Sequence, residues 1–342
     1  MDSSNLGSVP EETLEEQLHQ QQQESKPVVS AFASVPDRPP TQGFSQKYSP
    51  LDWSGYFDRE EDICIPDSND EQKDQLSFAL SASKIKEKAR IVAMDLRGHG
   101  KSSTENDLDL SIETMCNDVF AVLKALYGDS PPAIVLVGHS MGGSVAVHVA
   151  AKKTLRSLAG LVVVDVVEGT AMASLMHMQK ILSNRMQHFS SIEKAIEWSV
   201  RGGSLRNIDS ARVSIPTTLK YDDSKKWITG YEASIRRVPL LVGVRYKPGH
   251  YHRYEGLSEK FLSCPVPKLL LLAGTDRLDR ALTIGQMQGK FQMVVVRHTG
   301  HAIQEDAPDE FAMLILNFIS RNRIGPHGVE IPGLCRPARP QS

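Results

Sequence analysis

Short unbroken apolar runs alternate with longer segments of helical periodicity through the middle of the chain. The runs are short and continuous enough to be strands buried on both faces, and they lie at residues 90–94, 133–137, 161–164, 269–272 and 293–296. Helical patterns occupy residues 76–85, 111–127 and 311–319. Strands that alternate with helices predict an α/β architecture with a mainly parallel, doubly wound sheet. Ligands of such sheets bind at the carboxyl ends of the strands.

The ends of the chain and one internal segment depart from this rhythm. Residues 1–50 are Gln-rich and then Pro-rich, and we expect a disordered N-terminal tail. We expect an ordered domain over 51–324 and a loose tail over 325–342, which is rich in Pro and Gly. Residues 168–256 are Met-rich and then basic and irregular, which indicates an inserted cap over the active site. For most of the methionines we favour ordinary core filling.

Composition narrows the class of protein. The 342 residues are 40% hydrophobic, which is enough for a sizeable core. The formal net charge of −2 argues against nucleic acid or an anionic membrane as the main partner. No signal peptide or membrane-spanning run is visible, and the four cysteines form no C-x-x-C pair. We therefore expect a soluble intracellular protein, cytoplasmic or nuclear, without a structural metal or disulfide framework.

A G-x-S-x-G motif follows one of the predicted strands. It runs from Gly138 to Gly142 with Ser140 at its centre, and small apolar residues that suit a helix follow it. Strand, sharp turn and helix are the setting that a nucleophile elbow needs, because the serine occupies a strained turn where glycines let the backbones approach. The pattern predicts that Ser140 is a catalytic nucleophile.

A serine nucleophile needs a histidine base. His301 directly follows the predicted strand 293–296 near the end of the domain, where hydrolases of this architecture place their histidine. His298 lies in or beside that strand, and we expect a structural role for it. His139 adjoins the nucleophile, and we expect it to pack or to form a hydrogen bond. His250 and His252 are close in sequence, but no third metal ligand stands near them.

The acid that orients the histidine has two candidates. Asp165 follows strand 161–164, one strand after the elbow, and Asp276 follows strand 269–272, one strand later. Both come just after the carboxyl end of a strand, so the pattern alone leaves the choice open. Asp95 also follows a strand, but the stretch from Asp95 to Ser102 indicates a tight loop held by its own aspartate and by Arg97.

An oxyanion hole requires two backbone N–H donors. Met141, the residue after the nucleophile, is expected to supply one of them. The second usually comes from an HGGG-type loop after an earlier strand, and no such loop is present between Trp53 and Arg90. Polar residues 66–75 lead directly into the predicted helix 76–85.

Several longer stretches resemble the protein phosphatase methylesterase 1 family. They are 138–143, 164–172, 195–200, 210–214, 276–279 and 282–292, and the last is far more specific than the elbow. The similarity extends over about 53–64, 76–225 and 256–323. The resemblance implies an α/β-hydrolase that removes the methyl ester from the C-terminal leucine of the type-2A protein phosphatase catalytic subunit. It also implies that Asp165 is the triad acid and that Asp276 has a structural or supporting role.

The chain departs from that family in two places. The family has a strand and an HGGG-type loop where this chain passes from about Asp67 to Leu76, and the lost strand is central, between the strands ending at Met94 and Val137. The family's Trp-rich cap stretch is also absent from about 226–253. With these departures the chain resembles a splice variant or a faulty gene model of a methylesterase.

From these observations we expect a serine carboxylesterase of protein methyl esters that uses Ser140, Asp165 and His301, with Met141 as an oxyanion donor. No metal or organic cofactor is expected. The alternatives are a catalytically impaired variant that still binds the phosphatase, and a small-molecule esterase.

Overall fold

The computed structural model describes most of the chain between Gln46 and Val329. It describes residues 46–58, 63–65, 70–72, 79–99, 102, 104, 106–173, 186, 188–222, 226–229, 253–274, 278–325 and 328–329. All of these belong to one compact unit that starts at Gly43.

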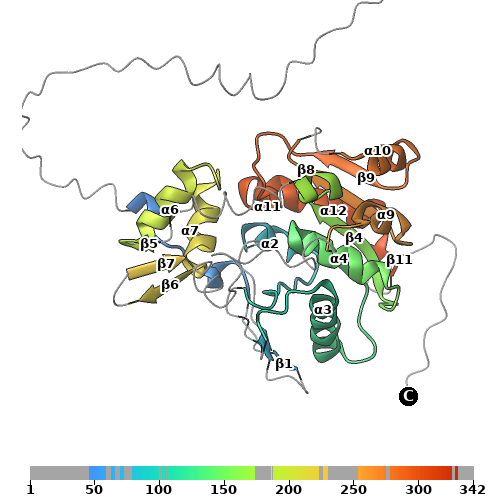
Figure 1. Cartoon of the computed structure of the whole chain (residues 1–342), viewed down its shortest axis with the longest axis horizontal. Helices are drawn as coiled ribbons and strands as arrows, with labels where there is room; N and C mark the ends of the chain where they lie inside the picture. Colours follow the sequence, from blue (N-terminus) through green and yellow to red (C-terminus); the bar gives the residue numbers. More distant parts are fainter. Residues whose placement is uncertain are drawn as a thin grey trace, which may run out of the picture. The chain divides into compact units, whose positions relative to one another are not determined.

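Figure 1 shows the described helices and strands in chain order. The helices are η1 (Gln46–Tyr48), η2 (Trp53–Gly55), α2 (Ala79–Ile85), α3 (Ile112–Tyr127), α4 (Met141–Ala151), α6 (Ile192–Arg201), α7 (Ile208–Thr217), α9 (Leu257–Ser263), α10 (Arg280–Met287), α11 (Ile303–Asp306) and α12 (Pro308–Arg321). The strands are β1 (Ile63–Ile65), β2 (Asp70–Gln72), β3 (Ile134–His139), β4 (Leu158–Val164), β5 (His188–Phe189), β6 (Leu219–Asp222), β7 (Lys226–Thr229), β8 (Lys268–Leu272), β9 (Gln292–Val295), β10 (Ile324–Gly325) and β11 (Gly328–Val329).

The central sheet has four parallel strands in the order β3-β4-β8-β9. Parallel pairing brings the carboxyl ends of these strands to one edge of the sheet, where His139 lies opposite Val164 and Val164 lies opposite Leu271. The residues that follow β3, β4 and β9 therefore gather at this edge. The predicted mainly parallel sheet is confirmed.

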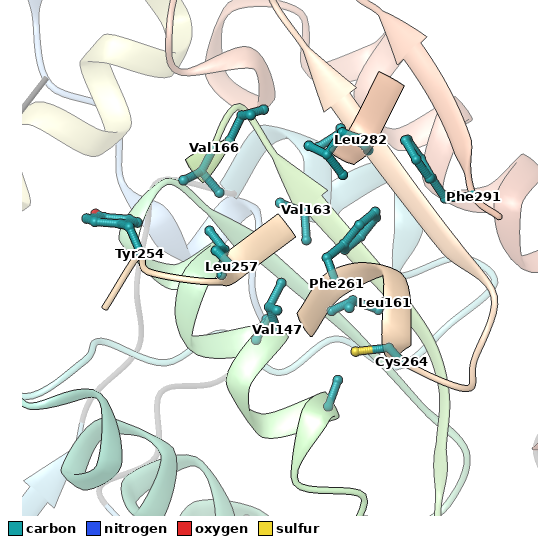
Figure 2. Close-up of a cluster of buried hydrophobic side chains, with 14 of the residues drawn as sticks. Val147, Leu161, Val163, Val166, Tyr254, Leu257, Phe261, Cys264, Leu282 and Phe291 are labelled. Atoms are coloured by element: carbon teal, nitrogen blue, oxygen red, sulfur yellow. The ribbon is translucent and has the colours of Figure 1, made fainter. Parts of the chain in front are cut away.

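Alternate residues of the central strands face two different helical layers. Leu161 and Val163 pack with side chains of α4, α9 and α10, and Figure 2 shows this cluster with Val147, Phe261 and Leu282 around them. Val162 and Val164 point to the other face, where they pack with side chains of α2, α11 and α12. Burial on both faces explains why these strands are apolar without a break.

The predicted strand at 90–94 does not form. Residues 91–96 have no assigned strand, although Ile91 still packs with one face of the sheet and Met94 and Leu96 with the other. Val92 is 43% exposed. A strand requires a neighbour for its backbone N–H and C=O groups, and the central strand that the related family has beside this segment is the one expected to be missing.

Strand β3 lies on the other side of the position where the extra strand of the family is expected. In the described structure β3 is an edge strand, paired with β4 alone. Residues 134–137 of β3 are only partly buried, whereas Ala159 to Val164 of β4 are buried. Among the described residues, therefore, no strand pairs with the second edge of β3, and unpaired strand edges are prone to associate with other chains.

The described part of residues 168–256, the predicted insertion, contains two helices and a small antiparallel sheet. Helices α6 and α7 pack together, and the strands pair in the order β5-β7-β6. Tyr48 of η1 is buried against the same helices with Ile196, Leu205 and Ala211. Met172 packs against the main core, as expected for a core-filling residue, whereas Met186 is exposed.

Several predictions lie outside the described residues. These concern the tail before Gln46, most of 66–78, the divergent cap segment 230–252 with His250 and His252, and Asp276. No helix among the described residues is long and apolar enough to cross a membrane.

Candidate active site

Ser140 lies in a sharp turn between β3 and α4. Its backbone has φ 51° and ψ −118°, a conformation that is costly for a residue with a side chain and that is typical of functional sites. A Cβ on Gly138 would lie 2.3 Å from the carbonyl oxygen of Gly142, and one on Gly143 would lie 2.7 Å from a Val166 methyl. Only glycine fits these two positions, so the turn has the geometry of a nucleophile elbow.

Asp165 follows the carboxyl end of β4, the strand beside β3. Its side chain is fully buried, and its backbone also has a positive φ, 49°. The Oδ1 atom accepts a hydrogen bond of 3.0 Å from the backbone N–H of Ala273. The Oδ2 atom lies 2.7 Å from Nδ1 of His301. Both carboxylate oxygens are therefore held in place.

His301 lies on the loop after β9, and its side chain is 53% exposed. A carboxylate accepts hydrogen bonds, so Nδ1 carries the proton that is donated to Asp165 and Nε2 is left as the basic atom. The His301 ring lies 4.6 Å, centroid to centroid, from the ring of His139, which precedes Ser140. Within the described structure no hydrogen bond joins Ser140 Oγ to His301; such bonds are often long before substrate binds.

His139 binds the histidine loop. Its Nε2 lies 2.8 Å from the carbonyl oxygen of His301, and a carbonyl can only accept, so Nε2 carries a proton. Burial, and to a smaller extent the charge of His301, lower the pKa of His139 to about 4. The ring is therefore neutral at pH 7. The hydrogen-bonding role predicted for His139 is confirmed.

Met141 is the first residue of α4, so its N–H is one of the free donors at a helix N-terminus. Its side chain meets a residue that the sequence did not single out. Arg253 is buried, with Nη1 at 2.9 Å from Met141 Sδ and Nη2 at 2.7 Å from the carbonyl oxygen of Leu110. This places a permanent positive charge beside the residue expected to supply the oxyanion donor.

The loop after residue 94 is held by its arginine, as predicted, but through an acid from outside the loop. Arg97 makes a buried bidentate ion pair with Asp118 of α3, with N–O distances of 2.6 and 2.7 Å. Ser102 Oγ donates to the backbone carbonyl of Asp95. The acid that holds Arg97 thus comes from the neighbouring helix.

Two acidic residues behind His301 were missed by the sequence analysis. Asp306 accepts hydrogen bonds from the backbone N–H groups of Gly300 and Arg206. Glu305 is buried beside Ser214, and burial raises the pKa of Glu305 to about 8. Neither residue follows a strand or belongs to a motif, so no sequence signal marked them.

The described residues contain no group of three His, Cys, Asp or Glu side chains that could hold a metal ion.

Comparisons with known proteins show which family the chain resembles. The model of the Alpha/beta hydrolase family matches residues 72–314. Protein phosphatase methylesterase 1 of Homo sapiens is 41% identical, over 82% of this chain and 87% of the relative. Probable protein phosphatase methylesterase 1 of Caenorhabditis elegans is 39% identical, over 83% and 81%. The human alignment spans 341 positions but takes up only 82% of this chain, so the relative has residues without a counterpart here.

Solved structures show the same fold. The crystal structure of E-2-(acetamidomethylene)succinate hydrolase superposes with a TM-score of 0.59 at 17% identity, over 77% of this chain and 99% of that one. At this level of identity the likeness concerns the fold alone.

Proposed function

The chain belongs to the protein phosphatase methylesterase 1 family of α/β-hydrolases, and from this membership we propose how it acts and on what. It is a carboxylic ester hydrolase by fold and family. The proposed substrate is the methyl ester at the C-terminal leucine of the type-2A protein phosphatase catalytic subunit, and the proposed triad is Ser140, Asp165 and His301.

In the proposed mechanism Ser140 Oγ attacks the ester carbonyl while Nε2 of His301 takes the serine proton. Asp165 holds the imidazolium through the Nδ1 hydrogen bond of 2.7 Å. The tetrahedral intermediate collapses when the methoxy group leaves as methanol, with the proton returned from His301. Water then attacks the acyl-enzyme by the same route and releases the free carboxylate.

The observation that carries the proposal is the buried contact between Asp165 and His301. These residues are 136 positions apart in sequence and follow different strands, yet a fully buried carboxylate meets a half-exposed imidazole at hydrogen-bond distance. A histidine whose Nδ1 is held by a buried carboxylate, at the same edge of the sheet as a serine in a strained turn, is suited to general-base catalysis.

The experiment measures methanol release from a methylated peptide and labelling by a fluorophosphonate. Ser140→Ala and His301→Ala should each remove most of the activity, with little further loss in the double variant, because the two residues act as a unit. Ser263→Ala is the matched control, since that exposed serine lies on α9 and bonds only within its own helix. Independent, multiplying losses would contradict the proposal.

A second candidate function is a phosphatase-binding protein with impaired catalysis. The unpaired edge of β3 favours it, because the strand and HGGG-type loop that usually supply the second oxyanion donor belong at that edge. Under this alternative the chain binds the phosphatase, but the fluorophosphonate does not label Ser140. A small-molecule esterase would instead hydrolyse short acyl esters as fast as the methylated tail.

A further inference from the structure

The backbone around His301 is held at two points. On one side, His139 Nε2 donates to the carbonyl oxygen of His301 itself. On the other side, the N–H of Gly300 donates to Oδ2 of Asp306 at 2.6 Å. A half-exposed ring on a surface loop has few packing contacts to orient it, so these backbone anchors matter for its placement.

The second oxygen of Asp306 binds the insertion. Oδ1 accepts a hydrogen bond of 2.7 Å from the N–H of Arg206, which lies between α6 and α7. Because a carboxylate has two acceptor oxygens in one rigid plane, Asp306 fixes the distance between the cap segment and the histidine loop. Hydrogen bonds to an ionised acceptor are among the stronger ones.

Glu305, the residue before Asp306, also joins the cap segment to the part of the chain that follows His301. Ser210 Oγ of α7 donates to the backbone carbonyl of Glu305 at 2.6 Å, and Ser214 Oγ donates to its carboxyl group at 2.5 Å. Helix α11, which has only four residues, thus lies between the cap helix α7 and the loop that carries His301. Three hydrogen bonds thus join α11 to this part of the chain, two of them from α7 and one from Arg206.

We propose that Asp306 is a positioning residue for His301, and that through Arg206 it makes the placement of the histidine depend on the α6–α7 part of the cap. This inference rests on the proposed esterase function of the same site. Asp306 acts through the backbone of Gly300 and takes no part in proton transfer.

The test uses the full chain with Asp306→Asn. One amide oxygen can accept only on one side, so the NH₂ group must face either the Gly300 or the Arg206 N–H and one anchor is lost. We expect kcat for a short acyl ester to fall about 10- to 100-fold with KM little changed, because small misplacements of a catalytic group cost this much. Asp309→Asn is the matched control, since Asp309 is exposed on the first turn of α12.

A double variant separates positioning from general damage to the fold. If Asp306 acts through His301, then Asp306→Asn should lower the residual activity of His301→Ala by less than twofold. An equal loss in both backgrounds, or an unchanged kcat in the single variant, would overturn the proposal. If Asp306→Asn is too unstable to assay, the downfield NMR signal of the His301 Nδ1 proton, recorded below its melting temperature, should still shift or broaden; an unchanged signal would overturn the proposal too. Failure of Ser140→Ala to abolish activity would instead refute the underlying function.

Discussion

Replacing Asp165 by Asn should impair the enzyme through the tautomer of His301. The side chain keeps its size, but one oxygen becomes an NH₂ group. The N–H of Ala273, 3.0 Å from Oδ1, decides which way the amide turns, because that donor needs an oxygen. The NH₂ group therefore faces His301, where it can only donate. Nδ1 must then accept, and the ring proton moves to Nε2, where it blocks the transfer from Ser140.

The magnitude follows from the loss of the general base. In other triads the same change costs on the order of 10⁴ in kcat with the geometry intact, which corresponds to about 5 kcal/mol of transition-state stabilisation. Asp165 is fully buried and both of its oxygens are engaged, so the amide that replaces it has no freedom to turn back. We expect the loss in kcat with little change in KM.

The assay is methanol release from a methylated peptide, with melting temperature as a check on folding. Asp276→Asn is the comparison, because Asp276 was the other acid that the sequence pattern allowed. It should cost far less than Asp165→Asn. Activity of Asp165→Asn within tenfold of the unaltered chain, or a greater loss at Asp276, would refute this account of the site.

Three further perturbations test other parts of the structure. Because burial raises the pKa of Glu305 from 4.5 to about 8, the unfolded state releases this proton at lower pH than the folded state does. The contribution of Glu305 to the unfolding free energy should therefore be present below pH 4.5 and fall towards pH 8, by up to about 1.4 kcal/mol per pH unit; Glu305→Gln should remove this slope in urea titrations, and an unchanged slope would disprove the assignment. Gly143→Ala should lower the unfolding free energy by about 1–3 kcal/mol, because its Cβ meets a Val166 methyl at 2.7 Å, whereas Gly142→Ala, with nothing within 4 Å, should be tolerated in the same melt; equal effects would argue against this packing of α4 on β4. Insertion of a strand and an HGGG-type loop between residues 67 and 76 should raise turnover 10²–10³-fold by restoring the second oxyanion donor and should reduce aggregation measured by light scattering; equal turnover before and after would mean that the donor comes from elsewhere.

The strands and helices of the core were predictable because their signals are local. The runs at 133–137, 161–164 and 269–272 are apolar on both faces, and this pattern fits a sheet covered by helices on each side. The helix predicted at 111–127 also carries its own start signal, since Ser111 caps α3. These features need no information from distant parts of the chain.

The site was only partly predictable, because the remaining contacts join segments far apart in sequence. Pattern placed Ser140 and His301 after strands but could not choose between two aspartates, and only the family resemblance favoured Asp165. The structure brings Asp165 to His301 because β4 and β9, which lie on either side of β8, end at the same edge of the parallel sheet. Asp306 and Arg253 had no signal at all, since their partners are backbone groups and a sulfur on other elements.

The segment at 90–94 shows why a correct local pattern can still give a wrong element. Its continuous apolar run is that of a buried strand, and its side chains do pack on both faces of the sheet: Ile91 on one and Met94 on the other. Among the described residues only the backbone pairing is missing, and pairing depends on a neighbouring strand, which we expect this chain to lack between 67 and 76. In the described part of the chain β3 also has a strand neighbour on one side alone. Both observations fit the expected loss of one strand between them, and that loss would also remove the usual source of the second oxyanion donor.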